Sequence, residues 1–298
     1  MATQLTAEVM QSVFTGFNTY FNKGLAQADT AYQAWAHEVN SVNAVEEFPV
    51  LGFDSSLRKW VGDRVFASLK AAKLSVKNEA YANGISVPRA NIEDDNISFF
   101  SPMFTQMGIA AANLFGDLAI KALLNPGKWA DGDDFFKSSR KFEKALINNV
   151  YAGALSATAF EAARAQMGGF TDAGGNALHL IPDLLIVGPS LESTAKRILE
   201  ADIVSDGTVA VSNVNKGAAK VLVNTELVGD YAGTWFLVCA NRGLKPVVVT
   251  KRKVGTLVRQ DREESNCVFE RDENRYGISC RGAAAAAYPW LVIRGKAS

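Results

Sequence analysis

The chain has 298 residues, of which 48% are hydrophobic, enough to bury a sizeable core in one large domain or two ordinary ones. Its 31 Lys and Arg residues balance its 31 Asp and Glu residues. This neutrality excludes the wrapping of nucleic acid through bulk positive charge and favours self-association over charge repulsion. Three widely spaced cysteines without a Cys-x-x-Cys pair predict reduced, buried thiols in a cytoplasm-like compartment: Cys239, Cys267 and Cys280.

The N-terminal segment predicts an amphipathic helix that ends near Gly24, because apolar residues recur there every fourth position, at Leu5, Val9, Val13 and Phe17. The segment lacks the basic start and continuous apolar run of a signal peptide, and it has few basic residues for the polar face of a membrane-surface helix. We therefore expect it to dock on protein. No stretch of the sequence approaches the ~20 apolar residues of a membrane span.

Residues 74–87 alternate between apolar and polar side chains, with Asn83-Gly84 interrupting the alternation. Asn-Gly between two alternating runs predicts a β-hairpin with a type I′ turn. Pro88 places the second strand at a sheet edge or near the end of that strand. The preceding charged segment around Trp60 has few apolar residues, so we expect it to be stabilised by packing against another surface.

Residues 102–124 predict a long helix of roughly 35 Å at ~1.5 Å per residue. Ser101 is the expected N-cap, Pro102 suits the first turn, and Asn125-Pro126-Gly127 ends the helix. Seven apolar residues form one stripe along it: Phe104, Met107, Ala111, Leu114, Phe115, Leu118 and Ala122.

The middle of the chain predicts alternating helices and strands. A helix over 139–151 is expected from the apolar spacing of Phe142, Leu146 and Val150, and a second helix from the capping-box spacing of Thr158 and Glu161. A buried strand, a tight turn and a helix capped by Ser190 follow. From about residue 219 the chain is rich in strand patterns, and we interpret the alanine run at 283–287 as part of a tightly packed sheet.

Three consecutive carboxylates, Glu93, Asp94 and Asp95, could form a metal or acid–base cluster, or they could begin the long helix. Carboxylates before a helix can accept its unpaired amide donors, or pair with a basic residue of a neighbouring subunit. As metal ligands they would need partners, and the only histidines of the chain are His37 and His179. We interpret the cluster as structural.

Other motifs carry little chemistry. The Val-Gly-Pro-Ser-Leu-Glu run around Ser190 lacks the second glycine of a nucleophile elbow, and neither His37 nor His179 has a second ligand at i+3 or i+4. The Asp-Gly-Asp-Asp-Phe-Phe run at 131–136 departs from the calcium-loop pattern, so we expect a solvated turn ahead of a helix. We assign no catalytic, cofactor-binding or metal-binding residue, expect no cofactor, and do not expect an enzyme. A soluble α/β hydrolase built on Ser190 and His179 remains an alternative.

Several motifs point to one family: Trp-Val-Gly-Asp-Arg at 60–64, Lys-Asn-Glu-Ala-Tyr at 77–81, Glu-Asp-Asp at 93–95 and Pro-Met-Phe-x-x-Met-Gly at 102–108. With them the chain resembles the major head (capsid) proteins of Mu-type tailed bacteriophages. The run at 131–136 is similar to the family's Asp-Gly-x-x-Phe-Phe element, although Arg140-Lys141 lies near where a His-Pro usually follows. The Phe…Tyr-Gly…Arg…Trp pattern of the C-terminal segment is also similar. The resemblance is strong over roughly 44–136, weaker at the C-terminus and thin in the middle.

The resemblance implies an α+β chain with the Hong Kong-type tailed-phage capsid fold. Its parts would be an N-terminal arm (1–43), an extended loop or E-loop (44–90), a peripheral domain with a long spine helix (91–137), an axial domain (138–240) and returning peripheral strands (241–298). The extended loop would reach over a neighbouring subunit.

The resemblance also implies a major capsid protein that self-assembles as hexamers and pentamers into an icosahedral shell around double-stranded DNA. Expected partners are a separate scaffold, a maturation protease, a portal protein, packaged DNA bound without sequence specificity, and optionally a decoration protein, with no membrane. The protein would be part of the virion and assemble in the cytoplasm of the host bacterium. A bacterial encapsulin, which shares the fold but encloses cargo enzymes, is the alternative within this fold.

Overall fold

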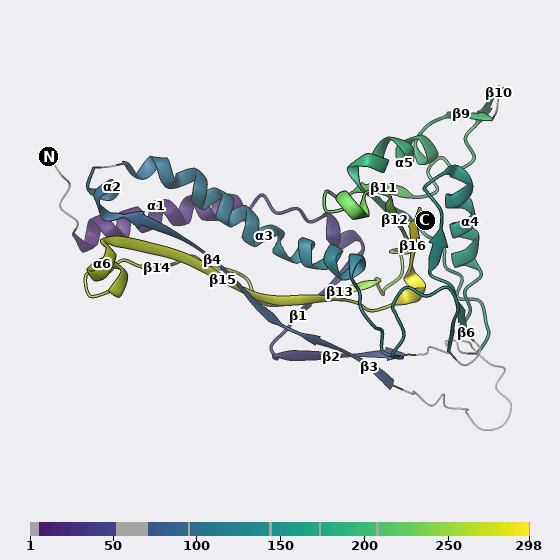
Figure 1. Ribbon diagram of the computed structural model, residues 1–298, viewed down its shortest axis with the longest axis horizontal. Helices are drawn as coiled ribbons and strands as arrows, with labels where there is room; N and C mark the ends of the chain where they lie inside the picture. Colours follow the sequence, from purple (N-terminus) through teal and green to yellow (C-terminus); the bar gives the residue numbers. More distant parts are fainter. Residues whose placement is uncertain are drawn as a thin grey trace.

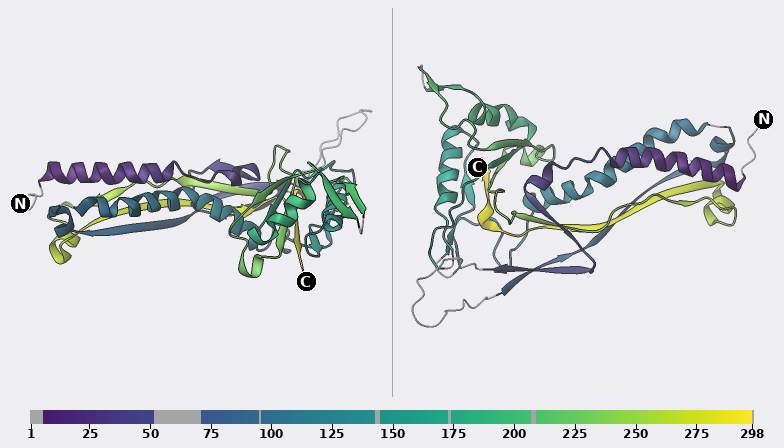
Figure 2. Two further views of the ribbon diagram at one scale, coloured as in Figure 1. Left: turned by 90° about the horizontal axis from the view of Figure 1, so that it is seen from above. Right: turned by 180° about the vertical axis from the view of Figure 1, so that it is seen from behind.

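The computed structural model describes residues 6–51, 71–94, 96–142, 145–172, 174–206 and 209–297. Two bodies make up the protein, an elongated one and a more compact one, with a thin two-stranded ribbon beside them (Figure 1). Figure 2 shows from two further sides that the helices of the long body run along a narrow, strongly elongated sheet.

The long body consists of two long helices on a five-stranded sheet. Its elements are α1 (Ala7–Leu25), α3 (Ser101–Leu124), β1 (Ala36–Asn40), β4 (Glu79–Pro88), β13 (Val247–Lys253), β14 (Val258–Gln260) and β15 (Glu273–Ala286). The sheet order is β1-β13-β15-β14, and β4 pairs with the other side of β15. β15 pairs with β4 over Glu273–Gly282 and with β13 over Arg281–Ala286, so this one strand holds both ends of the sheet together.

The N-terminal helix α1 docks on α3, which confirms that it packs on protein. Thr6 caps α1 by accepting a hydrogen bond from the Val9 amide at 3.4 Å. Phe17 of α1 stacks on Phe104 of α3 with ring centroids 4.1 Å apart, and Tyr276 of β15 meets both rings edge-on. The apolar stripes of both helices are therefore buried in one core over β15.

The long helix α3 spans Ser101–Leu124, as predicted, but Ser101 is its first residue and not its cap. A 3₁₀ turn, η2 (Asn96–Phe100), runs directly into it, and Phe100 at the cap position offers no side-chain hydrogen bond. The stretch Ile97–Leu124 is long and apolar enough for a membrane span, with a mean hydropathy of 1.5. The expectation that no stretch has the length and composition of a span is therefore wrong. Length and composition alone are weak evidence for a span, because a core helix has the same character.

The hairpin predicted at Asn83-Gly84 is wrong, because β4 runs straight through these residues. Gly84 lies opposite Gly277 of β15, and a Cβ atom on Gly84 would lie 3.3 Å from the Tyr276 carbonyl oxygen. The glycine therefore permits a close approach of two strands instead of a turn. β4 ends at Pro88, as the proline predicted.

The compact body consists of a mixed five-stranded sheet with helices beside it. The sheet order is β11-β8-β12-β16-β7, and its strands are β7 (Val150–Ala152), β8 (Leu184–Val187), β11 (Lys220–Val223), β12 (Thr234–Val238) and β16 (Val292–Lys296). The helices are α4 (Ala157–Gly168) and α5 (Glu192–Leu199), and β9 (Ile203–Asp206) and β10 (Val209–Ser212) form a separate pair that projects from the body (Figure 1). The last strand β16 thus returns the chain from the long body into the compact one.

The helix predicted over 139–151 is wrong, because this segment forms β5 (Arg140–Phe142), β6 (Ala145–Ile147) and β7. Ala145 and Ile147 are buried while Leu146 between them is 51% exposed, which is the two-residue period of a strand. Two expected caps also differ. Ser156 caps α4 by accepting from the Ala159 amide, and α5 begins at Glu192 after a 3₁₀ turn that contains Ser190.

The remaining strands, β2 (Val45–Leu51) and β3 (Ala71–Lys77), form an antiparallel ribbon that leaves the long body (Figure 1). At the far end of the long body lie two short helices, α2 (Arg89–Glu93) and α6 (Asn266–Arg271). Apart from these, the chain has short 3₁₀ turns at Ala31–Ala34 (η1), Pro189–Leu191 (η3), Gly229–Tyr231 (η4) and Pro289–Leu291 (η5).

Candidate assembly surfaces

A buried polar network fixes the base of the ribbon. The Asn78 amide donates to Ser41 Oγ at 2.6 Å and to the Asn43 carbonyl at 2.9 Å, and Asn78 Oδ1 accepts from Thr250 Oγ1 at 2.6 Å. Ser41 in turn donates to Glu46 at the start of β2, 2.8 Å away. Asn78 is 4% exposed, so each of its hydrogen bonds replaces water and the ribbon leaves the sheet of the long body in a defined direction.

An ion pair braces the sheet beside this network. Lys251 Nζ of β13 lies 2.5 Å from Glu38 Oε1 of β1, and the Tyr32 hydroxyl donates to the same carboxylate. Burial alone would raise the pKa of Glu38, but the hydrogen bonds from Lys251 and Tyr32 outweigh it and leave the pKa below its ordinary value. The Lys251 ammonium also lies 5.1 Å from the Phe115 ring centroid of α3, so it connects the sheet with the spine-like helix.

The Asp-Gly-Asp-Asp-Phe-Phe run forms a turn that is tied down by Arg140. Arg140 is 1% exposed, pairs with Asp131, donates to the Phe135 carbonyl at 3.2 Å and stacks over the Trp129 ring at 4.7 Å. The predicted turn is confirmed, but β5 follows it where a helix was expected. Arg140 was noted in the sequence only as a departure from a motif, and the fold shows that it holds the motif together.

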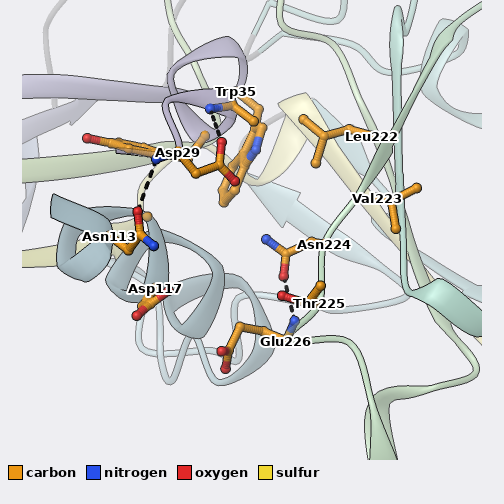
Figure 3. A pocket seen from close by; sticks show the side chains of 12 residues that line it. Asp29, Trp35, Asn113, Asp117, Leu222, Val223, Asn224, Thr225 and Glu226 are labelled. Atoms are coloured by element: carbon orange, nitrogen blue, oxygen red, sulfur yellow. Dashed lines mark hydrogen bonds between the residues drawn. The ribbon is translucent and has the colours of Figure 1, made fainter. Parts of the chain in front are cut away.

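A small cavity of about 140 Å³ lies where the two bodies meet (Figure 3). Asp29 and Asp117 face it from the side of α3, and Glu226 faces it from the loop after β11. The Asp29 amide donates to Asn113 Oδ1 at 3.0 Å, which fixes the loop before η1 on α3. Burial raises the pKa of the Asp117 carboxyl, and Glu226 and Asp29 raise it further against the opposing effect of Lys121. Three acidic side chains therefore line the joint between the two bodies.

The acidic cluster that the sequence placed before the long helix is not its cap. Glu93 is the last residue of α2 and Asp94 follows it, while α3 begins only at Ser101. Neither Glu93 nor Asp94 forms an ion pair or side-chain hydrogen bond with any residue that the structure describes, and Asp95 lies outside the described residues. The capping interpretation is therefore wrong for Glu93 and Asp94, and the alternative of a basic partner on a neighbouring subunit stays open.

The candidate catalytic residues do not form a site. Ser190 Oγ donates to the Ala232 carbonyl at 2.8 Å, and His179 lies in an exposed loop with a φ of 51°. His37 is exposed on β1. Within the described ranges, no three His, Cys, Asp or Glu side chains gather closely enough to hold a metal ion.

The three cysteines are free and buried, as predicted, and burial raises the pKa of the Cys239 and Cys280 thiols. Two further family motifs lie in buried parts of the fold. Asn78 of Lys-Asn-Glu-Ala-Tyr is the centre of the polar network, and Phe104 and Gly108 of Pro-Met-Phe-x-x-Met-Gly are buried against α1. The Trp-Val-Gly-Asp-Arg motif around Trp60 lies outside the described residues.

Comparisons with known proteins agree on one family. Residues 10–150, 144–227 and 223–298 match the family described as Mu-like prophage major head subunit gpT. The Mu-like prophage FluMu major head subunit of Haemophilus influenzae is 25% identical over 98% of this chain and 75% of that protein. The major capsid protein of Escherichia phage Mu is 30% identical over 98% of this chain and 75% of that protein.

Solved structures of capsids share the fold. The procapsid of bacteriophage JBD30 aligns with a TM-score of 0.59 at 22% identity, covering 99% of this chain and 77% of that one. The capsid of cyanophage P-SCSP1u aligns with a TM-score of 0.61 at 12% identity, covering 91% and 89%. The α+β architecture is thus the Hong Kong-type capsid fold, and the hydrolase alternative falls, because the family and its structural neighbours are structural proteins and not enzymes. The chain belongs to the Mu-like major head subunit family and is the major capsid protein of a Mu-like tailed phage.

Proposed function

We propose that the chain forms hexamers and pentamers that close into an icosahedral shell around double-stranded DNA. The observation that carries this proposal is the ribbon of β2 and β3. Among the residues that the structure describes, no third strand pairs with it, and Val45 at its base is 44% exposed. The base of the ribbon packs on its own subunit through Leu74 and Val76. A two-stranded ribbon is only marginally stable alone, so its outer part needs a second surface, which a neighbouring copy supplies.

Each part of the fold is expected to make a different kind of contact in the shell. In this proposal residues 1–43 are the N-terminal arm, 44–90 the extended loop, 91–137 and 241–298 the peripheral domain, and 138–240 the axial domain. The long body would carry contacts between capsomers and the compact body contacts around each capsomer axis. The ribbon would reach over the neighbouring copy while β4, the last part of 44–90, stays in the sheet of its own subunit.

The expected partners act during assembly in the host cytoplasm. We propose a separate scaffold, a maturation protease, a portal protein and, on the outside of the virion, a decoration protein. In support of the last, one solved relative of the fold is the capsid of bacteriophage JBD30 decorated with minor capsid protein trimers. Packaged DNA would be contacted by scattered Lys and Arg residues of a neutral chain, and so without sequence specificity.

The content of purified particles tests this proposal against the encapsulin alternative. Particles isolated from producing cells are treated with nuclease, opened and analysed for DNA and for enclosed protein. Protected double-stranded DNA is the expected result, and the chain should bind different duplexes with affinities that agree within about tenfold, or ~1.4 kcal/mol. Particles that hold a cargo enzyme and no DNA would contradict the proposal and favour the encapsulin alternative.

A further inference from the structure

The strand β4 presents a long open edge on the long body. It pairs with β15 along its whole length on one side, without a shift in register, and among the described residues no strand pairs with its other side. In the left view of Figure 2, β4 runs along the margin of the long body. Most of its residues are exposed. An open edge of this length is a template for the addition of a further strand.

Two hydrogen bonds identify the backbone groups on the open side. The Arg89 amide, directly after β4, donates to the Asp272 carbonyl at 3.0 Å, so the odd-numbered residues of the strand bond toward β15. The Gly84 amide donates instead to Asn83 Oδ1 at 2.8 Å. Because the backbone groups of a strand alternate between its two sides, four residues point their N–H and C=O groups outward: Ala80, Ala82, Gly84 and Ser86.

The open stretch has a defined beginning and end. At its beginning the Asn78 amide donates to the Ala44 carbonyl at 2.9 Å, so the segment that leads into β2 occupies the edge as far as Asn78. At its end Pro88 has no N–H, and the chain turns into α2. The free edge is therefore 79–87, and Asn83 is its midpoint.

The free edge lacks the features that protect edge strands in monomeric proteins. It contains no lysine, arginine or bulge, and its only charged residue is Glu79 at one end. The residues whose backbone points outward are all small, so their side chains leave room for a second strand: Ala80, Ala82, Gly84 and Ser86. The edge is thus accessible to another strand over its full length.

We propose that β4 pairs antiparallel with β4 of a second copy of this chain, across a two-fold axis at Asn83. The contact rests on the proposed shell function, because identical subunits of an icosahedral shell meet at two-fold axes, where one surface must be complementary to itself. The outward backbone groups fix the register, in which Ala82 pairs with Gly84 of the second copy and Ala80 pairs with Ser86 of the second copy. About eight backbone hydrogen bonds then join the two sheets into one.

The side chains are compatible with this register. On the side of the sheet that faces the helices, Tyr81 lies opposite Ile85 of the second copy, and an aromatic residue beside a β-branched one stabilises a pair of strands. Both are half-buried in the free subunit, so the pairing covers apolar surface that is still exposed. The two Glu79 carboxylates lie at opposite ends of the pair, so no like charges face each other.

Charges at Asn83 test the contact, because in this register Asn83 lies opposite itself. Asn83→Lys and Asn83→Asp should each lower the yield of shells by about tenfold or more, since like charges then meet at the axis. An equal mixture of the two variants should give at least about threefold more shells than either alone, because opposite charges can then pair. Asn83→Ala is the matched control and should assemble like wild type, because the backbone forms the contact.

A disulfide reports the geometry without relying on yield. Asn83 occupies a non-hydrogen-bonded position of the proposed pair, where Cα atoms lie about 4.5 Å apart, within reach of a disulfide. Shells of Asn83→Cys should therefore give a disulfide-linked dimer on oxidation. Ser86→Cys, on the same strand, lies opposite Ala80 of the second copy and should give none. The native cysteines are buried and do not compete.

The outcomes separate this contact from the shell function. Shells that form equally well with either charge at residue 83, and that give no Asn83→Cys dimer, would overturn the β4 contact alone. Equal crosslinking of Asn83→Cys and Ser86→Cys would overturn the two-fold register. A wild-type chain that forms no shell under any condition would overturn the shell function, and this contact with it.

Discussion

Gly24 of α1 and Gly108 of α3 face each other where the two helices of the long body cross. A Cβ atom on Gly108 would lie 2.1 Å from the Phe21 carbonyl oxygen and 3.0 Å from Gly24 Cα. A Cβ atom on Gly24 would likewise lie 2.1 Å from the Thr105 carbonyl oxygen. The two backbones therefore touch, and the N-terminal helix is held at a distance that only glycine allows at these two positions.

Gly108→Ala should destabilise the unassembled subunit by about 1–3 kcal/mol, because the atoms that the new methyl group meets belong to the backbone and cannot turn aside. Denaturant unfolding measures the change, and hydrogen exchange should show lost protection in α1. Gly16→Ala is the matched control in the same helix α1, at a half-buried position where a Cβ atom meets nothing within 4 Å. It should be stabilising by about 0.5–1 kcal/mol. Equal stability of Gly108→Ala and wild type would show that the helices cross elsewhere.

Asn78→Ala should cost about 1–3 kcal/mol, because Ser41 and Thr250 then lose their buried partner. The ribbon should also lose its fixed direction, so that shell yield falls more than folding stability alone explains. Asn83→Ala, an exposed asparagine on β4, serves as the control. Hydrogen exchange completes the test, because residues 45–51 and 71–77 should be protected in shells and exchange quickly in free subunits. Strong protection in both states would place the ribbon in the core of its own subunit.

Arg140→Ala should destabilise the subunit by about 3–5 kcal/mol, because it leaves Asp131 and buried carbonyl groups without their partner. The neighbouring Lys141→Ala, at an exposed position, should change stability by less than about 0.5 kcal/mol. Thermal unfolding of the two variants compares them directly. If both substitutions have the same small effect, Arg140 does not hold the turn at 131–136.

Asp117→Asn should raise the melting temperature at neutral pH. The folded pKa of Asp117 lies above the ordinary value of 3.8, so the stability linked to its protonation is complete below 3.8 and is lost as pH rises through the raised pKa. Asparagine does not titrate and removes the repulsion from Glu226 and Asp29. The advantage of the variant should therefore shrink as pH falls toward 3.8. An advantage that stays constant with pH would contradict this origin.

Much of the fold could be predicted where a local sequence pattern fits only one type of secondary structure. The apolar stripes of Phe17 and Phe104 predicted two amphipathic helices, and the β-rich segments after residue 219 predicted strands up to β16. The prediction failed where the same residues fit two types of secondary structure. Asn83-Gly84 suits a turn, but glycine also suits a strand that passes close to Gly277, and only the tertiary pairing decides between them.

The assembly surfaces were less predictable, because their residues come from distant parts of the sequence. The cavity at the far end of the long body is lined by Arg89, Arg262 and Asn274 among others, and no local pattern connects these residues. Asn78 did leave a signal, since it continues the two-residue alternation of Leu74 and Val76 and so predicts a buried polar residue that needs partners. The partners, Ser41 and Thr250, could be found only from the fold.

The central claim is that this chain is built to assemble, and light scattering of the purified protein at micromolar concentration, with electron micrographs of the same sample, tests it most directly. Edge strands, a ribbon that pairs with no third strand among the described residues and a chain without net charge predict capsomers, tubes or closed shells whose mass is many times the 32.1 kDa of one chain. A single monodisperse species with the mass of one chain at every salt concentration, even with scaffold present, would contradict it.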